Sequence, residues 1–171
     1  VASARMGPAL DDVKRAAEAL VNAKRPLLYA GQGVHYARAW KQLKELAELL
    51  ALPVTTSLAG KSSFPENHPL SLGAGGGALG RHTQHFVDQA DVIFGVGCSF
   101  SATNFGIGFP SRGKTYIHAT WDAAELNKNV VTDYPILGEA DLVLDAMLAE
   151  VRDRLKGKPR DVNATAKDIA A

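Results

Sequence analysis

The chain has 171 residues, of which 46% are hydrophobic and 22% are charged, and its formal net charge is +1. These values are typical of an ordinary globular domain with room for one sizeable core. They exclude a strongly basic nucleic-acid-binding protein, and no apolar run reaches the roughly 18 residues expected of a membrane span.

The first half of the chain predicts two helices and three strands. Residues 1–7 are expected to form a linker, and a helix is expected after Pro8, where Asp11 and Asp12 suit the positive end of its dipole. Apolar runs at 27–30 and 53–56 predict buried strands, and apolar residues at helical spacing over 37–50 predict a second helix between them. A short strand is expected at 70–72.

The second half continues the alternation. Helices are expected at 79–89, 123–127 and 142–155, and strands at 91–96, 115–120 and 134–137. The polar tail after Leu155 is expected to be a linker. Strands alternating with helices predict an α/β fold, in which a parallel sheet carries helices on both faces.

Glycine-rich turns follow two of the predicted strands. Gly31-Gln32-Gly33 could bring backbone N–H groups close to a phosphate at a helix N-terminus, or it could be a plain tight turn. The dinucleotide fingerprint would need a third glycine at Tyr36. Gly97 and Ser99 could likewise contact a ligand or simply end their strand. Ligands of open α/β sheets lie beyond such strand ends, so a nucleotide-sized crevice is one interpretation.

Other polar residues leave the same choice open. Asp122 could accept hydrogen bonds from a ribose or could cap a short helix. Gly138 and Glu139 could close over a ligand or could begin the final helix. The one cysteine, Cys98, excludes an internal disulfide and suits an apolar filler better than a nucleophile. The histidines show no zinc-binding spacing.

The first residues of the chain bear on its cellular location and on whether it is part of a longer protein. No apolar segment of a secretory signal follows Val1, so a cytoplasmic location is expected. Because the first residue is not Met, we expect the chain to be a piece of a longer protein.

Several segments, in chain order, resemble one family. The central domain of thiamine-diphosphate enzymes is similar to this chain over residues 8–156; relatives include acetolactate synthase, pyruvate oxidase, oxalyl-CoA decarboxylase and benzaldehyde lyase. The matching segments are Ala23–Gly33, Leu52–Thr56, Gly60–Leu70, Ala90–Gly97, Ile117–Asn129 and Ile136–Ala140. The resemblance implies a Rossmann-like open parallel sheet of about six strands. It also implies that 157–171 is a linker to a pyrophosphate-binding domain.

The resemblance further implies a division of labour. In the family, thiamine diphosphate and Mg²⁺ are held by the sister pyrimidine- and pyrophosphate-binding domains, which need a glutamate and a Gly-Asp-Gly motif respectively. The chain contains no Gly-Asp-Gly, so it is not expected to be catalytic alone. Its parent is expected to form or cleave C–C bonds in 2-oxo acids, as a homodimer or homotetramer, with no nucleic-acid or membrane partner.

In some relatives the central domain holds FAD or ADP. Here an Asp-Asp-Arg that tends to contact the phosphate is missing after Phe100, and Thr120 and Trp121 replace an acid and a small apolar residue. These departures predict a weak or vestigial nucleotide site, with a stand-alone nucleotide-binding module or a purely structural domain as alternatives. Lys61 could neutralise a phosphate. The candidate cofactor-binding residues are Gly31, Gln32, Gly33, Lys61, Gly97, Ser99, Asp122, Gly138 and Glu139.

Overall fold

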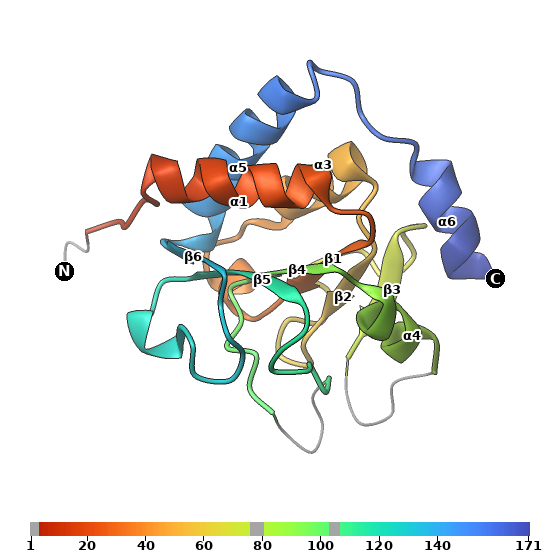
Figure 1. Cartoon of the computed structure of the whole chain (residues 1–171), viewed down its shortest axis with the longest axis horizontal. Helices are drawn as coiled ribbons and strands as arrows, with labels where there is room; N and C mark the ends of the chain where they lie inside the picture. Colours follow the sequence, from red (N-terminus) through yellow and green to blue (C-terminus); the bar gives the residue numbers. More distant parts are fainter. Residues whose placement is uncertain (1–3, 76–80, 103–106) are drawn as a thin grey trace.

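Six parallel strands form one open sheet in the order β3-β2-β1-β4-β5-β6 (Figure 1). The computed structural model describes residues 4–75, 81–102 and 107–171. Each strand is short, and the central strands β1 and β4 are apolar and buried on both faces, as expected of parallel strands. The strands are β1 (Pro26–Ala30), β2 (Val54–Thr56), β3 (Ser71–Ala74), β4 (Val92–Val96), β5 (Thr115–Thr120) and β6 (Tyr134–Leu137).

Three long helices cover one face of the sheet, which is the upper face in Figure 1. They are α1 (Leu10–Asn22), α3 (Trp40–Leu50) and α5 (Ala140–Arg154), and α5 packs against both of the others. Their apolar stripes enclose one core with side chains such as Leu28 and Phe94. The helices end where their apolar stripes end; Ala51, for example, closes α3 in the left-handed conformation at φ 52°.

The opposite face is covered differently. Leu27, Ile93 and Tyr116 point to this side and pack with Phe100 and with Val87 of α4 (Arg81–Gln89). The rest of the cover comes from the segments that follow β4 and β5, which contribute Phe100, Ile107 and Val130. The segment after β5 also contains the short 3₁₀ helix η1 (Ala123–Glu125). The predicted parallel α/β sheet with helices on both faces is therefore confirmed, with the long helices gathered on one of them.

The helix predicted over 37–50 starts later in the structure, and a separate short helix precedes it. A four-residue helix, α2 (Gly33–Tyr36), comes first, and α3 starts only at Trp40. Between them Arg38 takes a left-handed conformation with φ 53°, which interrupts the helical path. The break leaves Tyr36 on the rim of the sheet, 73% exposed.

The tail also differs from the prediction. Residues 157–171 were expected to be a linker, but they contain a helix, α6 (Val162–Ala170), begun by Asp161, whose Oδ1 accepts from the N–H of Asn163 at 2.9 Å. The hydroxyl of Thr165 donates to the carbonyl oxygen of Ala51 at 3.0 Å. Ile169 packs against the core on the lower face of the sheet, which contains Leu27 and Ile93. The polar composition of this segment concealed a helix that needs the body of the domain to cover its few apolar side chains.

Candidate functional site

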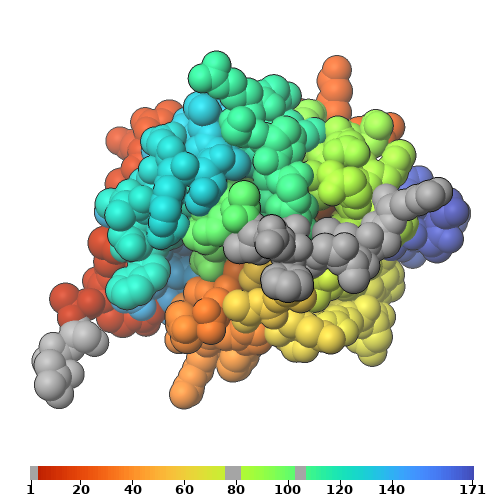
Figure 2. Space-filling model, turned by 90° about the horizontal axis from the view of Figure 1, so that it is seen from below, coloured from red at the N-terminus to blue at the C-terminus, as the bar shows by residue number. Residues whose placement is uncertain are grey.

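The strand order reverses between β1 and β4. The chain leaves β1 toward β2 on one side and leaves β4 toward β5 on the other, which opens a crevice at the carboxyl ends of the two central strands. A cavity of about 450 Å³ lies there. Figure 2 shows this underside, where orange and yellow segments that follow β1 and β2 lie against green and cyan segments that follow β4 and β5. The described residues lining the cavity are Tyr29, Gly31, Gln32, Gly33, Tyr36, Ser57, Leu58, Ala59, Gly97, Cys98, Ser99, Ser101, Thr120, Trp121, Asp122 and Glu125.

The two glycine turns form the floor of this cavity by packing on each other. A Cβ added to Gly31 would lie 2.2 Å from the carbonyl oxygen of Gly97, a distance that no real side chain tolerates. Gly97 itself has φ 59°, which favours glycine. These residues are glycine because two stretches of backbone meet here, a cause that operates with or without a ligand.

The N–H groups of the first turn are already engaged. Gly31 donates to the carbonyl oxygen of Val96 at 2.9 Å, Gly33 donates to that of Gly97 at 2.9 Å, and Val34 donates to that of Gly31 at 3.2 Å. This turn was predicted to present backbone N–H groups to a phosphate. In the structure, the N–H groups at these three positions donate to the protein's own backbone instead.

Six of the nine predicted site residues line the cavity, and three do not. Those that line it are Gly31, Gln32, Gly33, Gly97, Ser99 and Asp122. Lys61 is not among the described lining residues; its ammonium lies 3.8 Å from Glu66 and its carbonyl oxygen accepts from the His35 ring at 2.8 Å. No basic side chain remains among the described residues of the cavity wall.

Gly138 and Glu139 belong to a different feature. Both Nε and Nη2 of Arg5 donate to Glu139 Oε2, at 3.0 and 2.7 Å, and the N–H of Met6 donates to Oε1 at 3.2 Å. Arg5 also pairs with Asp141 at 2.7 Å. The hydrogen bonds that Glu139 accepts from Arg5 and from the N–H of Met6 lower its pKa. Gly138 packs closely under the backbone of Met6 and Pro8. The two residues hold the N-terminal segment.

Asp122 serves as a helix cap, with its Oδ1 accepting from the N–H of Ala124 at 2.9 Å. Glu125, one 3₁₀ turn later, also lines the cavity and was missed by the sequence prediction. Its Oε1 accepts from Lys128 at 3.0 Å, and its Oε2 is buried without a hydrogen-bond partner among the described residues. The sequence did contain a signal for Glu125: it lies three residues after Asp122, and this spacing places both acids on the same side of a 3₁₀ helix.

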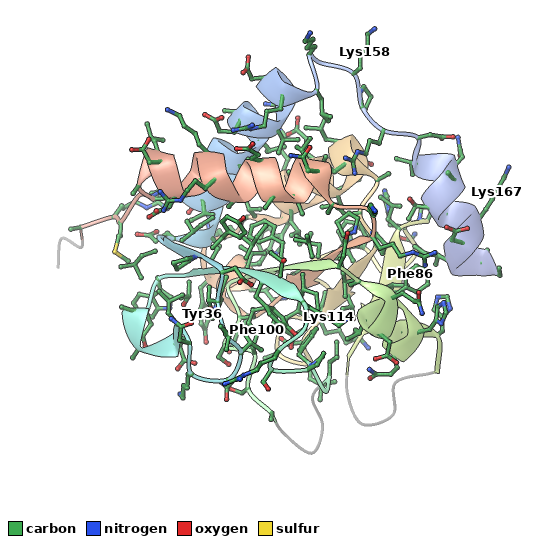
Figure 3. The ribbon with its side chains drawn as sticks, in the orientation of Figure 1. Tyr36, Phe86, Phe100, Lys114, Lys158 and Lys167 are labelled. Atoms are coloured by element: carbon green, nitrogen blue, oxygen red, sulfur yellow. The ribbon has the colours of Figure 1, made fainter. Side chains whose placement is uncertain are left out.

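An apolar rim surrounds the cavity. Trp121 is 67% exposed and Leu58 is 55% exposed, and both line the opening together with Tyr36. Figure 3 shows Tyr36 on the same lower side of the sheet as Phe100, whose ring is buried beneath β4 and β5. Large apolar side chains left in water around an opening are typical of a surface that binds something.

The surroundings of Cys98 and His118 disfavour the charged forms of both side chains. Burial raises the pKa of the Cys98 thiol to about 12, so the thiolate is scarce at neutral pH. His118, 1% exposed, donates through Nε2 to the carbonyl oxygen of Cys98 at 2.8 Å, and burial lowers its pKa. A neutral histidine that holds a backbone carbonyl is a structural residue. Cys98 therefore fits the apolar-filler interpretation.

In the described parts of the chain, no three His, Cys, Asp or Glu side chains lie together in a way that could hold a metal ion. No described helix has both the length and the apolar character needed to cross a bilayer.

Comparison with known proteins gives a consistent answer. Residues 13–147 match the family model described as "Thiamine pyrophosphate enzyme, central domain". The chain is 38% identical over 148 residues to a probable acetolactate synthase large subunit of Methanocaldococcus jannaschii, covering 83% of this chain and 25% of that protein. It is 37% identical over 154 residues to the acetolactate synthase isozyme 3 large subunit of Escherichia coli K12, covering 87% and 26%.

Solved structures agree. Benzoylformate decarboxylase from Polynucleobacter necessarius superposes with a TM-score of 0.75 at 26% identity, over 96% of this chain and 30% of that one. A putative thiamin diphosphate-dependent enzyme from Mycobacterium smegmatis gives 0.72 at 26% identity, over 94% and 32%. The chain thus spans about a quarter of the length of these acetolactate synthases. It belongs to the family of thiamine pyrophosphate enzyme central domains.

Proposed function

We propose that the chain is the central, spacing domain of an enzyme that uses thiamine diphosphate and Mg²⁺ to form or cleave C–C bonds in 2-oxo acids. The family match over 13–147 supports this role, and the raised pKa of Cys98 and the lowered pKa of His118 agree with chemistry carried by sister domains. Thiamine diphosphate, when bound, supplies the electron sink for such reactions. This chain contributes a rigid sheet between the two sister domains that bind thiamine diphosphate.

The proposal for the whole enzyme is tested on the full-length gene product. Consumption of 2-oxo acids should require both thiamine diphosphate and Mg²⁺, and the isolated chain should show none of it. Light scattering should find the full-length enzyme as a homodimer or homotetramer. A full-length product without activity on any 2-oxo acid would contradict the proposed reaction.

We further propose that the cavity at the β1–β4 junction is a weak or vestigial nucleotide site of the kind that holds FAD or ADP. The observation that carries this is its position, at the reversal of strand order, where ligands of open α/β sheets bind. Its volume of about 450 Å³ lies in the lower half of the usual range of about 300–1,000 Å³ for ligand pockets. FAD would extend beyond it.

Calorimetric titration of the chain with FAD, ADP and NAD tests the site. We expect dissociation constants near or above 100 μM, because the described residues of the wall offer no basic side chain to a phosphate. Ala59→Trp, at an exposed position in the cavity wall, should abolish binding, whereas Leu10→Trp on α1 should leave it intact. Binding that survives Ala59→Trp would place the ligand elsewhere.

A further inference from the structure

The charges of the cavity wall decide which part of a ligand it can hold. Asp122 and Glu125 are the charged side chains among the described lining residues, and both are carboxylates. Lys128 offsets part of one charge through Oε1 of Glu125, but it is not itself a described lining residue and is 55% exposed. A phosphate in this cavity would therefore meet negative charge without a matching cation among the described lining residues.

The hydrogen-bonding groups of the wall point the same way. Oε2 of Glu125 is a buried acceptor that lacks a donor among the described residues, and a buried polar atom is normally paired. Oγ1 of Thr120 already accepts from the N–H of Asp122 at 3.2 Å, while the N–H groups of Gly31 and Gly33 are used by backbone carbonyls. The carboxylates of Asp122 and Glu125 can only accept hydrogen bonds from a ligand, and the glycine turn has few donors to offer it.

The rim adds a preference for flat apolar surface. Trp121, Tyr36 and Leu58 line the cavity while standing largely in water. Aromatic side chains in such positions stack on planar rings. A ligand that covers these side chains removes their apolar area from water, whether or not the ligand is charged.

We infer that this cavity selects an uncharged planar ring compound that carries N–H or O–H donors, such as an unphosphorylated nucleoside, over the corresponding nucleotide. The inference rests on the proposed function in that the cavity must bind a ligand at all. The ring lies against Trp121 and Tyr36, and a donor group of the ligand pairs with Glu125. Phosphates attached to such a ligand weaken its binding.

Adenosine and ADP are the matched probes, because they share a ring and a ribose and differ in phosphate. Calorimetry on the chain in low salt should give a dissociation constant for adenosine that is lower than that for ADP by on the order of tenfold. Added salt should narrow the difference, since it screens the repulsion. Fluorescence offers a second readout: Trp40→Phe leaves Trp121 as the one tryptophan of the chain, and adenosine should quench it.

Two variants test the cause of the selectivity. Glu125→Gln removes one charge with little change of shape and should reduce the preference for adenosine, whereas Glu18→Gln on α1 should leave it unchanged. Ala59→Arg adds the missing cation to the wall and should strengthen ADP binding about tenfold, with Leu10→Arg as the control of equal net charge. Each variant should keep the wild-type thermal midpoint to within a few degrees.

The outcomes separate the two proposals. Tighter binding of ADP or FAD than of adenosine would overturn the selectivity and uphold the nucleotide site. Failure of all these ligands to bind, in the wild type and in Ala59→Arg alike, would overturn both. Tighter adenosine binding that is insensitive to Glu125→Gln and to salt would overturn the electrostatic cause.

Discussion

Gly33 and Gly97 meet backbone to backbone where β1 and β4 end: a Cβ on Gly97 would lie 2.8 Å from the Cα of Gly33 and 2.8 Å from the N of Val34. This contact joins the start of α2 to the end of the central strand. It fixes the floor of the cavity and brings the Tyr36 and Ser99 sides of the wall together.

We expect Gly97→Ala to destabilise the domain by about 2–5 kcal/mol. The new Cβ meets backbone atoms that cannot move aside, and alanine resists the positive φ of this position. Chemical denaturation followed by circular dichroism measures the change. Gly108→Ala is the control, because a Cβ there meets nothing within 4 Å, and it should change stability by less than about 0.5 kcal/mol. Equal effects of the two variants would show that the close contact does not exist.

The Arg5–Glu139 pair should hold the N-terminal segment in a pH-dependent way. Because Arg5 lowers the folded-state pKa of Glu139, the attachment should be complete above the ordinary carboxyl pKa of 4.5 and should be lost as the pH falls toward the lowered value. At neutral pH, Glu139→Gln should speed amide hydrogen exchange of residues 5–7. Asp145→Asn, at an exposed position of α5, should not. An unchanged rate of amide hydrogen exchange in Glu139→Gln would show that Glu139 does not hold the N-terminal segment.

Cys98 should react slowly with iodoacetamide in the folded chain. Burial raises its pKa to about 12, so the rate at pH 7 should be far below that of an exposed thiol and should still be rising at pH 10. An exposed thiol would level off above its ordinary pKa near 8.5. The chain has one cysteine, so mass spectrometry reports this site alone, and the denatured chain supplies the fast reference. A plateau near pH 8.5 in the folded chain would contradict the raised pKa of this half-buried thiol.

Helix α6 should depend on its cap. Asp161→Ala removes the acceptor for the N–H of Asn163 and should weaken the helix locally by about 0.5–2 kcal/mol. Hydrogen exchange over 162–170 should quicken while the strands stay protected, since a terminal helix can open on its own. Asp168→Asn removes the same charge near the other end of α6 and should not have this effect. Loss of protection throughout the sheet would mean that the tail is integral to the core.

Residue pattern alone identified most of the fold. The continuous apolar run at 92–96 and the alternation of strands with amphipathic helices depend on neighbours within a few residues, so periodicity predicts them. Glycines at the ends of β1 and β4 likewise placed the cavity correctly. The family resemblance rested on short sequence segments, and the match over 13–147 confirmed it.

Tertiary structure decided what those residues do. Glu139 pairs with Arg5, 134 positions away, and so lies outside the cavity to which the sequence assigned it. The N–H of Gly33 is consumed by Gly97, and Glu125 enters the wall through the turn of η1. Local propensity carries no record of such distant contacts: a side chain or N–H group takes whichever partner the folded chain brings within hydrogen-bond distance, and only the assembled sheet determines that partner.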